Sequence, residues 1–353
     1  MKTLWLYVDP NHLETADALA ALGQAAEILR DGGLVALPTE TVYGLGANAL
    51  DRAAVESIFK AKGRPAWDPV IVHIAGPDFG NAMLDLLVEE IPDAARRLMK
   101  AFWPGPLTLL LKRTARVPDA VTAGRPLVGV RMPSHPVALE LIRRAGVPVA
   151  APSANRFGHT SPTTAAHVLE DLDGRIDMVL DAGATAQGLE STVLDVGQSP
   201  MVIYRPGAVT AQQIGAVGGP VVVYQQIEAL ETTPREAMPS PGVGLKHYAP
   251  RARLILLEGP LEEMGARMTE EVRCFSRERV GVMLPGEVRL EAAPAAVYAW
   301  GRWAAPEEMA RTLYAGLRAL DAEQCTVILC PLPSADGIGA ALRDRLLKAG
   351  NLK

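Results

Sequence analysis

Two patterns of hydrophobic residues alternate along the first two hundred positions of the chain, one with the periodicity of a helix and one in the short apolar runs typical of strands. Between Thr15 and Arg30 apolar residues return every three or four positions, which predicts an amphipathic helix stopped by Gly32-Gly33. The next apolar run, LVAL at 34–37, is short and is broken by Pro38, as expected of a buried strand. A second helix is predicted to begin at Asp51, as its N-cap, and to end at Gly63.

Strands dominate the later part of this region. Further strands are predicted at 70–74, 108–112, 127–132, 147–152, 178–183, 191–196 and 201–207, with helices at 92–101, 135–146 and 163–172. For the last helix, Ser161 is the predicted N-cap and Pro162 the first helical residue. We therefore expect an α/β fold, a mixed sheet with helices packed on it.

A second region follows a stretch, 216–249, that is rich in helix breakers and has little periodicity. Beyond it, RLILLE, VGVML, AVYAW and CTVILC read as strands, and 306–320 and 338–349 as helices, which predicts a small α/β domain. The predicted organisation is a catalytic domain over 1–215, a linker over 216–249 and a second domain over 250–353.

The composition narrows the class of protein. The 353 residues fit two domains, and 49% hydrophobic with 21% charged residues suits globular packing. A net charge of −5 offers no general attraction to nucleic acid or anionic membranes. The three cysteines contain no C-x-x-C pair, which argues against a disulfide framework and a structural zinc site. The N-terminus is a poor signal peptide and no window approaches the ~18 apolar residues of a spanning helix, so we expect a cytoplasmic protein with no membrane partner.

Polar side chains lie at the ends of several predicted strands. They are Thr39, Thr41, Arg131, Ser153, Asn155 and Arg205. Ser191 instead opens its strand, so it joins them only if that strand runs antiparallel. Each residue alone also suits a turn or a strand end. Their recurrence predicts a ligand site, because loops can converge at strand ends without disturbing the core.

Lys60, Lys62 and Arg64 gather around the end of the second helix. Cations there offset the helix macrodipole, but Lys and Arg also suit a polyphosphate clamp, and Gly63 and Pro65 fix the backbone as a clamp requires. The local pattern leaves both alternatives open. Neither G-x-x-x-x-G-K-[ST] nor G-x-G-x-x-G occurs, so an ATP site here is of neither the P-loop nor the kinase type.

Ser161 and His73 each have two interpretations. Ser161 suits an N-cap, and the free N–H groups of the same helix start also suit a phosphate, so its two roles are compatible. His73 lies in an apolar strand, where a histidine usually belongs to the core. Alternation puts it on the face of Ile71, opposite Val70, Val72 and Ile74, but does not say whether that face borders a cavity.

Eight ordered motifs carry a resemblance to a known family. LPTETVYGLGANA, KGRP, PLTLLL, VGVRMP, APSAN, SPTTA, ESTVLD and RPG occur in the order and spacing of the YrdC/Sua5 family, and SPGVGLKHYAP with the trailing domain resembles its longer Sua5 branch. The resemblance covers nearly the whole chain. It implies a YrdC-like twisted mixed sheet with flanking helices around an open cavity, plus a smaller C-terminal Rossmann-like α/β domain. It also implies an enzyme, a nucleotidyltransferase that forms L-threonylcarbamoyladenylate and pyrophosphate from L-threonine, bicarbonate or CO2, and ATP.

The resemblance assigns site residues by motif. Lys62 with Arg64 matches the family's K-x-R, and Ser153 with Asn155 its S-x-N; both pairs are expected to be catalytic and to act on the nucleotide phosphates. The threonine pocket is expected to contain Thr41, His73, Arg131 and Ser191, with Arg131 facing the substrate carboxylate. The expected ATP contacts are Arg64, Asp68, Ser153, Ser161, Arg205 and Tyr248, the last folding the linker over the site.

Two residues depart from the family pattern. Asp68 stands where the family commonly has Asn or Ser, and a carboxylate beside a triphosphate repels it unless it holds Mg²⁺ or bonds a ribose or base. Phe157 replaces a small residue after SAN and is expected to reshape the edge of the nucleotide site.

The implied reaction sets the cofactor and the partners. It needs positioning and charge neutralisation at phosphorus rather than a Cys or Ser nucleophile. Mg²⁺ is expected with ATP, held by the nucleotide and water and not by dedicated protein ligands. The product is expected to pass to a tRNA threonylcarbamoyl-transferase complex that modifies adenosine 37 of tRNAs reading codons that begin with A, with only weak or transient tRNA contact by this chain.

Two other functions remain as alternatives. YrdC-like modules also occur in carbamoyltransferases of hydrogenase maturation, but those carry zinc-finger and acylphosphatase-like regions that this sequence lacks. An RNA-binding module would bind tightly with a steep salt dependence, and the acidic net charge counts against it. The trailing domain has no motif of its own chemistry, and we hypothesise that it positions the linker as a lid.

Overall fold

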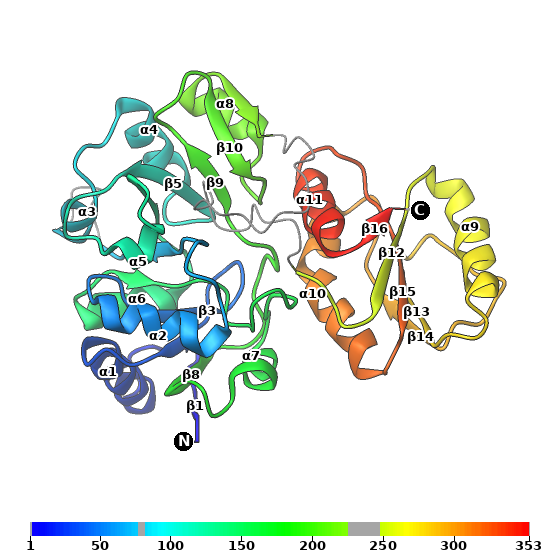
Figure 1. Ribbon diagram of the computed structural model, residues 1–353, viewed down its shortest axis with the longest axis horizontal. Coiled ribbons are helices and arrows are strands. Elements are labelled where there is room, and N and C mark those ends of the chain that lie inside the picture. Colours follow the sequence, from blue (N-terminus) through cyan, green and yellow to red (C-terminus); the bar gives the residue numbers. More distant parts are fainter. Residues whose placement is uncertain (1, 77–81, 225–247, 353) are drawn as a thin grey trace. The chain divides into compact units, whose positions relative to one another are not determined.

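The computed structural model describes residues 2–76, 82–224 and 248–352, and the chain divides into two compact units (Figure 1). Among these residues, the larger unit comprises 2–157, 162–186 and 190–224. The smaller unit comprises 158–161, 187–189 and 248–352, so two short segments from the first half of the chain belong to it.

A mixed sheet of eleven strands forms the larger unit, which confirms the predicted class of sheet. In order across the sheet, the strands are β1 (Leu4–Tyr7), β8 (Met178–Asp181), β2 (Val35–Leu37), β3 (Gly44–Asn48), β7 (Val149–Ala150), β4 (Ile71–His73), β6 (Leu127–Arg131), β5 (Leu107–Lys112), β9 (Thr192–Asp195), β10 (Met201–Arg205) and β11 (Val221–Val223). Strand β4 runs parallel to β6 and antiparallel to β7, while β9 runs parallel to β5 and antiparallel to β10.

Helices cover both faces of this sheet. They are α1 (Ala16–Arg30), α2 (Arg52–Lys62), α3 (Ala82–Leu87), α4 (Asp93–Phe102), α5 (Asp119–Thr122), α6 (Pro136–Ala145), α7 (Ala165–Leu172) and α8 (Ala211–Gly218). Apolar residues of α1 and α6 form one core with Val35 and Leu37. Those of α2, α4, α7 and α8 form the other core, which takes Ala36 from the same strand, because successive side chains point to opposite faces.

Among the described residues, no helix contributes to the apolar cluster on one face of part of the sheet. On β4, β5 and β9, the buried cluster Ile71, Leu110 and Val193, with Leu127 and Tyr204 packed against it, contains no helical residue. The alternating residue of β4, Val72, belongs instead to the core under α2 and α4. By the same alternation His73 lies on the face of Ile71, as the sequence pattern predicts.

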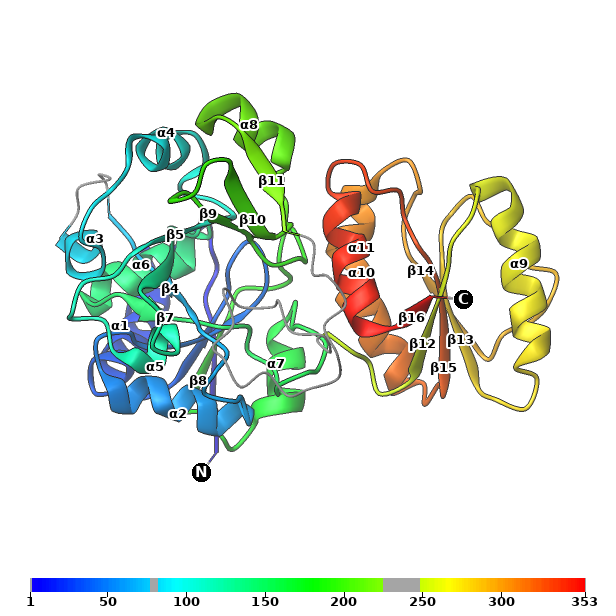
Figure 2. The same cartoon turned by 45° about the horizontal axis from the view of Figure 1, so that its top comes forward.

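The smaller unit is a parallel sheet of five strands with helices on both faces. The strands are β14 (Ala296–Ala299), β13 (Val280–Leu284), β15 (Val327–Pro331), β12 (Arg253–Leu257) and β16 (Asn351–Leu352), in that order. Figure 2 shows α9 (Leu261–Cys274) on one face, with α10 (Pro306–Ala322) and α11 (Gly339–Ala349) on the other. The smaller unit is thus the parallel α/β domain that the resemblance implied, with the strand order 3-2-4-1-5 in chain numbering.

Some predicted bounds are wrong. The last predicted helix of the larger unit begins later, as α7, and Thr164 is its N-cap, accepting a hydrogen bond from the His167 N–H at 3.3 Å. The N-cap role predicted for Ser161 is therefore wrong. The linker prediction is wrong at its start, because α8 extends to Gly218 and β11 pairs with β10. The rest of that prediction, 225–247, lies outside the described residues.

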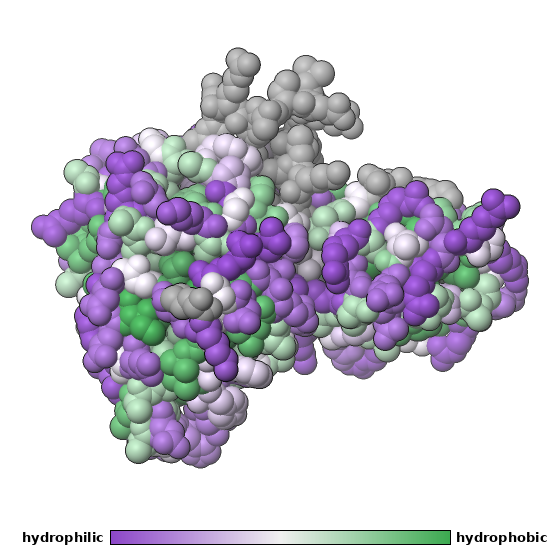
Figure 3. Space-filling model, turned by 60° about the horizontal axis from the view of Figure 1, so that its bottom comes forward, coloured by the Kyte–Doolittle hydropathy of each residue, from purple (hydrophilic) through white to green (hydrophobic). Residues whose placement is uncertain are grey.

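The remaining surface features are ordinary for a globular protein. Hydrophilic side chains cover most of the face shown in Figure 3, with smaller apolar areas between them. The three cysteines are free, with Cys325 and Cys330 buried and Cys274 exposed. Within the described ranges, no helix has both the length and the hydropathy to cross a membrane.

Candidate active site

Arg131, at the end of β6, is the centre of a buried polar group. Its Nε donates to the carbonyl of Gly105 at 3.2 Å, and its Nη1 donates to the hydroxyl of Thr41 at 3.0 Å. Its Nη2 lies 2.6 Å from Oε1 of Glu40, and both of these side chains are buried. The guanidinium is thus held on three sides by groups from two loops, one after β2 and one before β5.

The loop after β2 is folded by the hydroxyl of Thr39. This hydroxyl accepts the N–H of Thr41 at 3.2 Å and of Val42 at 3.3 Å, and it donates to the carbonyl of Val42 at 2.6 Å. The Thr39 and Thr41 hydroxyl oxygens are 2.8 Å apart. Thr39 thereby fixes the direction in which Thr41 meets Arg131.

His73 is the neighbour of Arg131 on the adjacent parallel strand, where the two residues are in register. Burial, and then the positive charge of Arg131, lower the pKa of His73 to about 3. The imidazole is therefore neutral at physiological pH. Its Nδ1 is buried and has no hydrogen-bond partner among the described residues.

Ser191 and Arg205 meet at the same edge of the sheet as His73 and Arg131. Strand β9 is parallel to β5, which is antiparallel to β6, so the start of β9 lies beside the end of β6. The condition set for Ser191 by the sequence is therefore met. Its hydroxyl is 2.8 Å from that of Thr108 and accepts a hydrogen bond from Arg205 Nη2 at 3.1 Å. A register shift between Ile203 and Arg205 lies where this arginine turns toward Ser191.

Lys62 joins the two expected phosphate motifs. At the last residue of α2 it is almost fully buried, and its ammonium donates to the carbonyls of Ser153 and Asn155, each at 2.5 Å. Burial, with Arg64 nearby, lowers the pKa of Lys62 well below its usual value. An ammonium has three N–H donors, so a third remains for an anion.

Arg64 and Asp68 form a buried ion pair. Arg64 Nη2 lies 2.9 Å from Asp68 Oδ2, and each side chain is 3% exposed. Arg64 also donates to the carbonyls of Asp68 at 3.1 Å and Pro69 at 2.7 Å, which closes the turn after α2. The carboxylate that departs from the family pattern is therefore matched by a cation of the same motif.

The residues expected at strand ends form two groups and not one. Strand β7 is antiparallel to β4, so Ser153 and Asn155, which follow β7, lie toward the start of β4. Lys62, Arg64 and Asp68 join them there through the contacts above. His73, at the end of β4, belongs to the Arg131 group. The two groups therefore lie toward opposite ends of the short strand β4.

Ser161 and Tyr248 belong to the smaller unit. Ser161 is fully buried. Tyr248 is 2% exposed, its ring stacks on Tyr314 with 5.9 Å between centroids, and the guanidinium of Arg345 lies 5.2 Å from its centroid. In this structure the Tyr248 ring is therefore part of the smaller unit's interior.

Sequence reasoning missed two polar residues of the Arg131 group. Glu40 lies inside the motif LPTETVYGLGANA, and Thr108 begins the predicted strand 108–112, but the sequence pattern assigns neither of them to the site. The signal for Glu40 was a charged residue inside an almost wholly apolar or uncharged run, 34–46, where a carboxylate needs a cationic partner. Thr108 gave no such signal, because threonine is common in strands.

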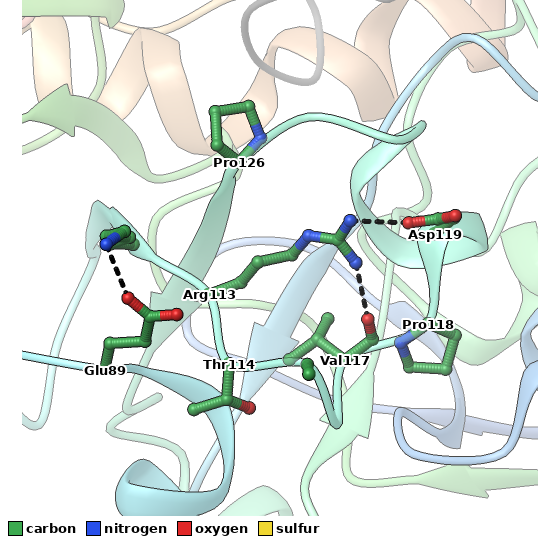
Figure 4. Close-up of a pocket in the computed structure, with 9 residues that line it drawn as sticks. Glu89, Arg113, Thr114, Val117, Pro118, Asp119 and Pro126 are labelled. Carbon is green, nitrogen blue, oxygen red and sulfur yellow. Dashed lines mark hydrogen bonds and ion pairs between the residues drawn. The ribbon is translucent and has the colours of Figure 1, made fainter.

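A metal-ligand cluster is absent from the described residues, and a hollow beside β5 lies apart from these groups. No set of three or more His, Cys, Asp or Glu side chains in the described part of the chain could hold a metal ion. A hollow of about 620 Å³ beside β5 is lined by Lys112, Arg113 and their neighbours (Figure 4). Its charges pair with each other, Lys112 with Glu89 at 2.7 Å and Arg113 with Asp119 at 2.5 Å, and no predicted site residue lines it.

Comparison with known proteins decides the family. Residues 27–207 match the family model Sua5_yciO_yrdC, described as telomere recombination, and residues 209–351 match the C-terminal domain of threonylcarbamoyl-AMP synthase. The threonylcarbamoyl-AMP synthases of Bacillus subtilis and Pyrococcus abyssi are 44% and 43% identical to this chain, over 99% and 93% of it and 98% and 94% of their own lengths. The crystal structure of P. abyssi Sua5 complexed with L-threonine superposes with a TM-score of 0.88 at 40% identity, covering 98% of this chain and 97% of that one.

The chain belongs to the Sua5-type threonylcarbamoyl-AMP synthases. Membership of this family accounts for both units, since one family model falls on the larger sheet and the other on most of the smaller one.

Proposed function

We propose that this chain forms L-threonylcarbamoyladenylate and pyrophosphate from L-threonine, bicarbonate or CO2, and ATP, and that the product serves the N6-threonylcarbamoyl modification of adenosine 37 in tRNAs reading codons that begin with A. The observation that carries the proposal is the pair of separate polar groups on one sheet. One is centred on Arg131 and suits an amino acid; the other is centred on Lys62 and suits polyphosphate.

At the first group, Arg131 would bind the threonine carboxylate with Thr41 and Ser191 beside it. An arginine fork matches a carboxylate, and a dry site strengthens the contact. Neutral His73 adds a polar wall without a second positive charge. Hydroxyl groups near the substrate can hydrogen-bond its side-chain hydroxyl, which distinguishes threonine from valine.

At the second group, Lys62 and the S-x-N loop would hold the triphosphate. Lys62 fixes the loop through two carbonyls and has one donor left, while Ser153 and Asn155 supply further polar groups. The remaining proposed ATP contacts are Arg64, Asp68, Ser161, Arg205 and Tyr248, of which Arg205 lies beside Ser191 in the first group. Because Asp68 and Arg64 are paired, we expect Asp68 to act indirectly. It holds the Arg64 side chain in position and lowers the net positive charge of the phosphate group.

The reaction then needs orientation more than covalent chemistry. The threonine amine attacks CO2 or bicarbonate to give a carbamate, whose oxygen attacks the α-phosphorus and displaces pyrophosphate. Mg²⁺ bound with ATP would neutralise phosphate charge, and triphosphate oxygens and water are its expected ligands. The protein groups hold the two substrates and offset the charge that develops at phosphorus.

The partners and location follow from this proposal. The adenylate is an activated intermediate that a tRNA threonylcarbamoyl-transferase complex would consume, and with a net charge of −5 this chain is expected to contact tRNA only weakly. The cytoplasm, where tRNA and ATP meet, is the proposed location.

The proposal is tested by pyrophosphate release from ATP, Mg²⁺ and bicarbonate, with and without L-threonine. We expect release that depends on threonine and is lost in Lys62→Ala, which removes the ammonium from the phosphate group. Lys60→Ala, an exposed lysine on the same helix, is the matched control and should keep activity. Pyrophosphate release that ignores threonine would overturn the proposal.

A further inference from the structure

Glu40 is the buried charge of the Arg131 group to which neither the sequence nor the proposed function assigns a role. Glu40 is 5% exposed, and its Oε1 lies 2.6 Å from Arg131 Nη2. Taking a carboxylate out of water is costly unless its oxygens are paired and hydrogen-bonded. A counter-ion alone meets only part of this requirement.

The hydrogen bonds of this pair are incomplete. No described residue gives a well-aligned hydrogen bond to either oxygen of Glu40, and Arg131 Nη2 donates none either. By contrast, Arg131 Nε and Nη1 are both used, on Gly105 and Thr41. The acceptors and donors without a hydrogen bond are therefore next to each other. They are the carboxylate oxygens of Glu40 and the Nη2 group of Arg131.

A ligand that fills both needs must carry an anion and a cation next to each other. An α-amino acid does so, because its carboxylate and its ammonium are attached to the same carbon, and an ammonium has three donors for carboxylate oxygens. A simple carboxylate would satisfy Arg131 and be repelled by Glu40. An amine would satisfy Glu40 and be repelled by Arg131.

We propose that Glu40 accepts the ammonium of the amino-acid substrate and thereby makes the Arg131 group selective for zwitterions. This inference rests on the proposed function, and it adds a specificity residue that none of the expected site residues supplies. The pair is closed to water, so it must open to admit the ligand, and the contacts then form in a medium of low dielectric constant, where they are strong.

The test compares two ligands that differ only in the group facing Glu40. L-Threonine has the ammonium, and (2S,3R)-2,3-dihydroxybutanoate has a hydroxyl in its place. Calorimetric Kd values are measured without ATP for the wild-type chain and for Glu40→Gln. We expect Glu40→Gln to bind threonine about 10- to 100-fold more weakly, the usual range for a hydrogen bond to a charged group. The hydroxy acid should bind the variant as well as or better than the wild type, since Arg131 no longer has a competing anion.

If Glu40→Gln loses the same affinity for both ligands, Glu40 only positions Arg131, and the inference is overturned. The inference is also overturned if the variant loses affinity for neither ligand. If the wild-type chain itself fails to bind threonine, the proposed function fails with the inference. Glu140→Gln, the same change at a half-buried carboxylate paired with Arg143 and Arg144 on α6, is the control and should leave both Kd values unchanged. Should Glu40→Gln not fold, Glu40→Asp keeps the charge but withdraws it, and it must then weaken threonine binding and spare the hydroxy acid.

Discussion

At the scale of single residues, burial decides which charges the site can carry. His73 is forced to be neutral, Arg64 and Asp68 are forced to pair, and Lys62 is charged only at a cost that carbonyl groups and an anionic ligand offset. These states follow from desolvation and neighbours and not from residue type. Two of them can be measured without substrate.

The first residue-scale prediction concerns His73 and stability at low pH. Its pKa is about 3 in the folded protein, against an unfolded value near 6.5, so below pH 6.5 the unfolded chain binds a proton that the folded chain does not. The unfolding free energy should therefore decrease as the pH is lowered from about 6.5 to about 3. At pH 4 the contribution of His73 to this decrease should be up to about 3 kcal/mol. Urea titrations at several pH values give the unfolding free energy as a function of pH. This free energy should depend less steeply on pH in His73→Asn than in the wild type. His12→Asn, at an exposed histidine whose pKa is raised by Asp9, should not reduce this dependence; an unchanged dependence in His73→Asn would contradict the assignment.

The second residue-scale prediction concerns Asp68. Asp68→Asn keeps hydrogen-bonding capacity but leaves the Arg64 charge buried without its Asp68 counter-ion, and this should cost about 3–5 kcal/mol of unfolding free energy. The same change makes the phosphate group more positive, so the KM for ATP should fall several-fold while that for threonine stays the same. Glu56→Gln, in an exposed pair with Arg52, should change neither quantity by much. A raised KM for ATP would mean that Asp68 itself holds the nucleotide.

At the scale of elements, α2 shows what local sequence rules can and cannot reach. Both ends of this helix were predictable, because Asp51 accepts hydrogen bonds from the N–H groups of Ala53 and Ala54, and Gly63 takes the left-handed φ of 64°. The two interpretations of Lys60, Lys62 and Arg64 were not separable from sequence. In the structure Lys60 is exposed, while Lys62 and Arg64 are buried in polar contacts of the S-x-N loop and the turn after α2.

The two ends of α2 give a matched pair of substitutions. Asp51→Ala removes the N-cap and Gly63→Ala strains a left-handed residue with open space around it, so each should cost about 1 kcal/mol of stability. Only Gly63 lies between Lys62 and Arg64, so only Gly63→Ala should raise the KM for ATP. Denaturation curves and steady-state pyrophosphate release measure both effects. Equal kinetic defects in the two variants would show that helix stability, and not the phosphate group, controls the rate.

At the scale of the whole molecule, the sequence predicted the fold class and the two α/β regions, but not the division of the site. Alternation in β4 put His73 on the correct face, since Val70, Val72 and Ile74 all lie in the opposite core. The separation of Ser153 from His73 was not predictable, because it depends on β7 running antiparallel to β4, and pairing direction is a long-range property. Strand β3 was missed because its Gly-rich segment GLGAN has low strand propensity and is held by its neighbours. The membership of 158–161 in the smaller unit likewise depends on contacts far apart in sequence.

The last prediction concerns the smaller unit, which the sequence suggested positions the linker as a lid. Tyr248 is the described residue next to that linker, it has a left-handed φ of 66°, and its ring is stacked on Tyr314 inside this unit. If this stacking sets where the linker ends, removing it should lower turnover even though Tyr314 has no part in the chemistry.

Tyr314→Ala and Leu329→Ala each empty a fully buried position of the smaller unit, and each should cost about 3 kcal/mol or more. Leu329 packs in the core under α9, away from the stacked rings, so only Tyr314→Ala should lower kcat, and Tyr314→Phe, which keeps the ring, should restore it. Hydrogen exchange checks that both alanine variants loosen this unit alike. A kcat that falls equally in both would assign the effect to the unit's stability, and a kcat that falls in neither would leave the lid without this support.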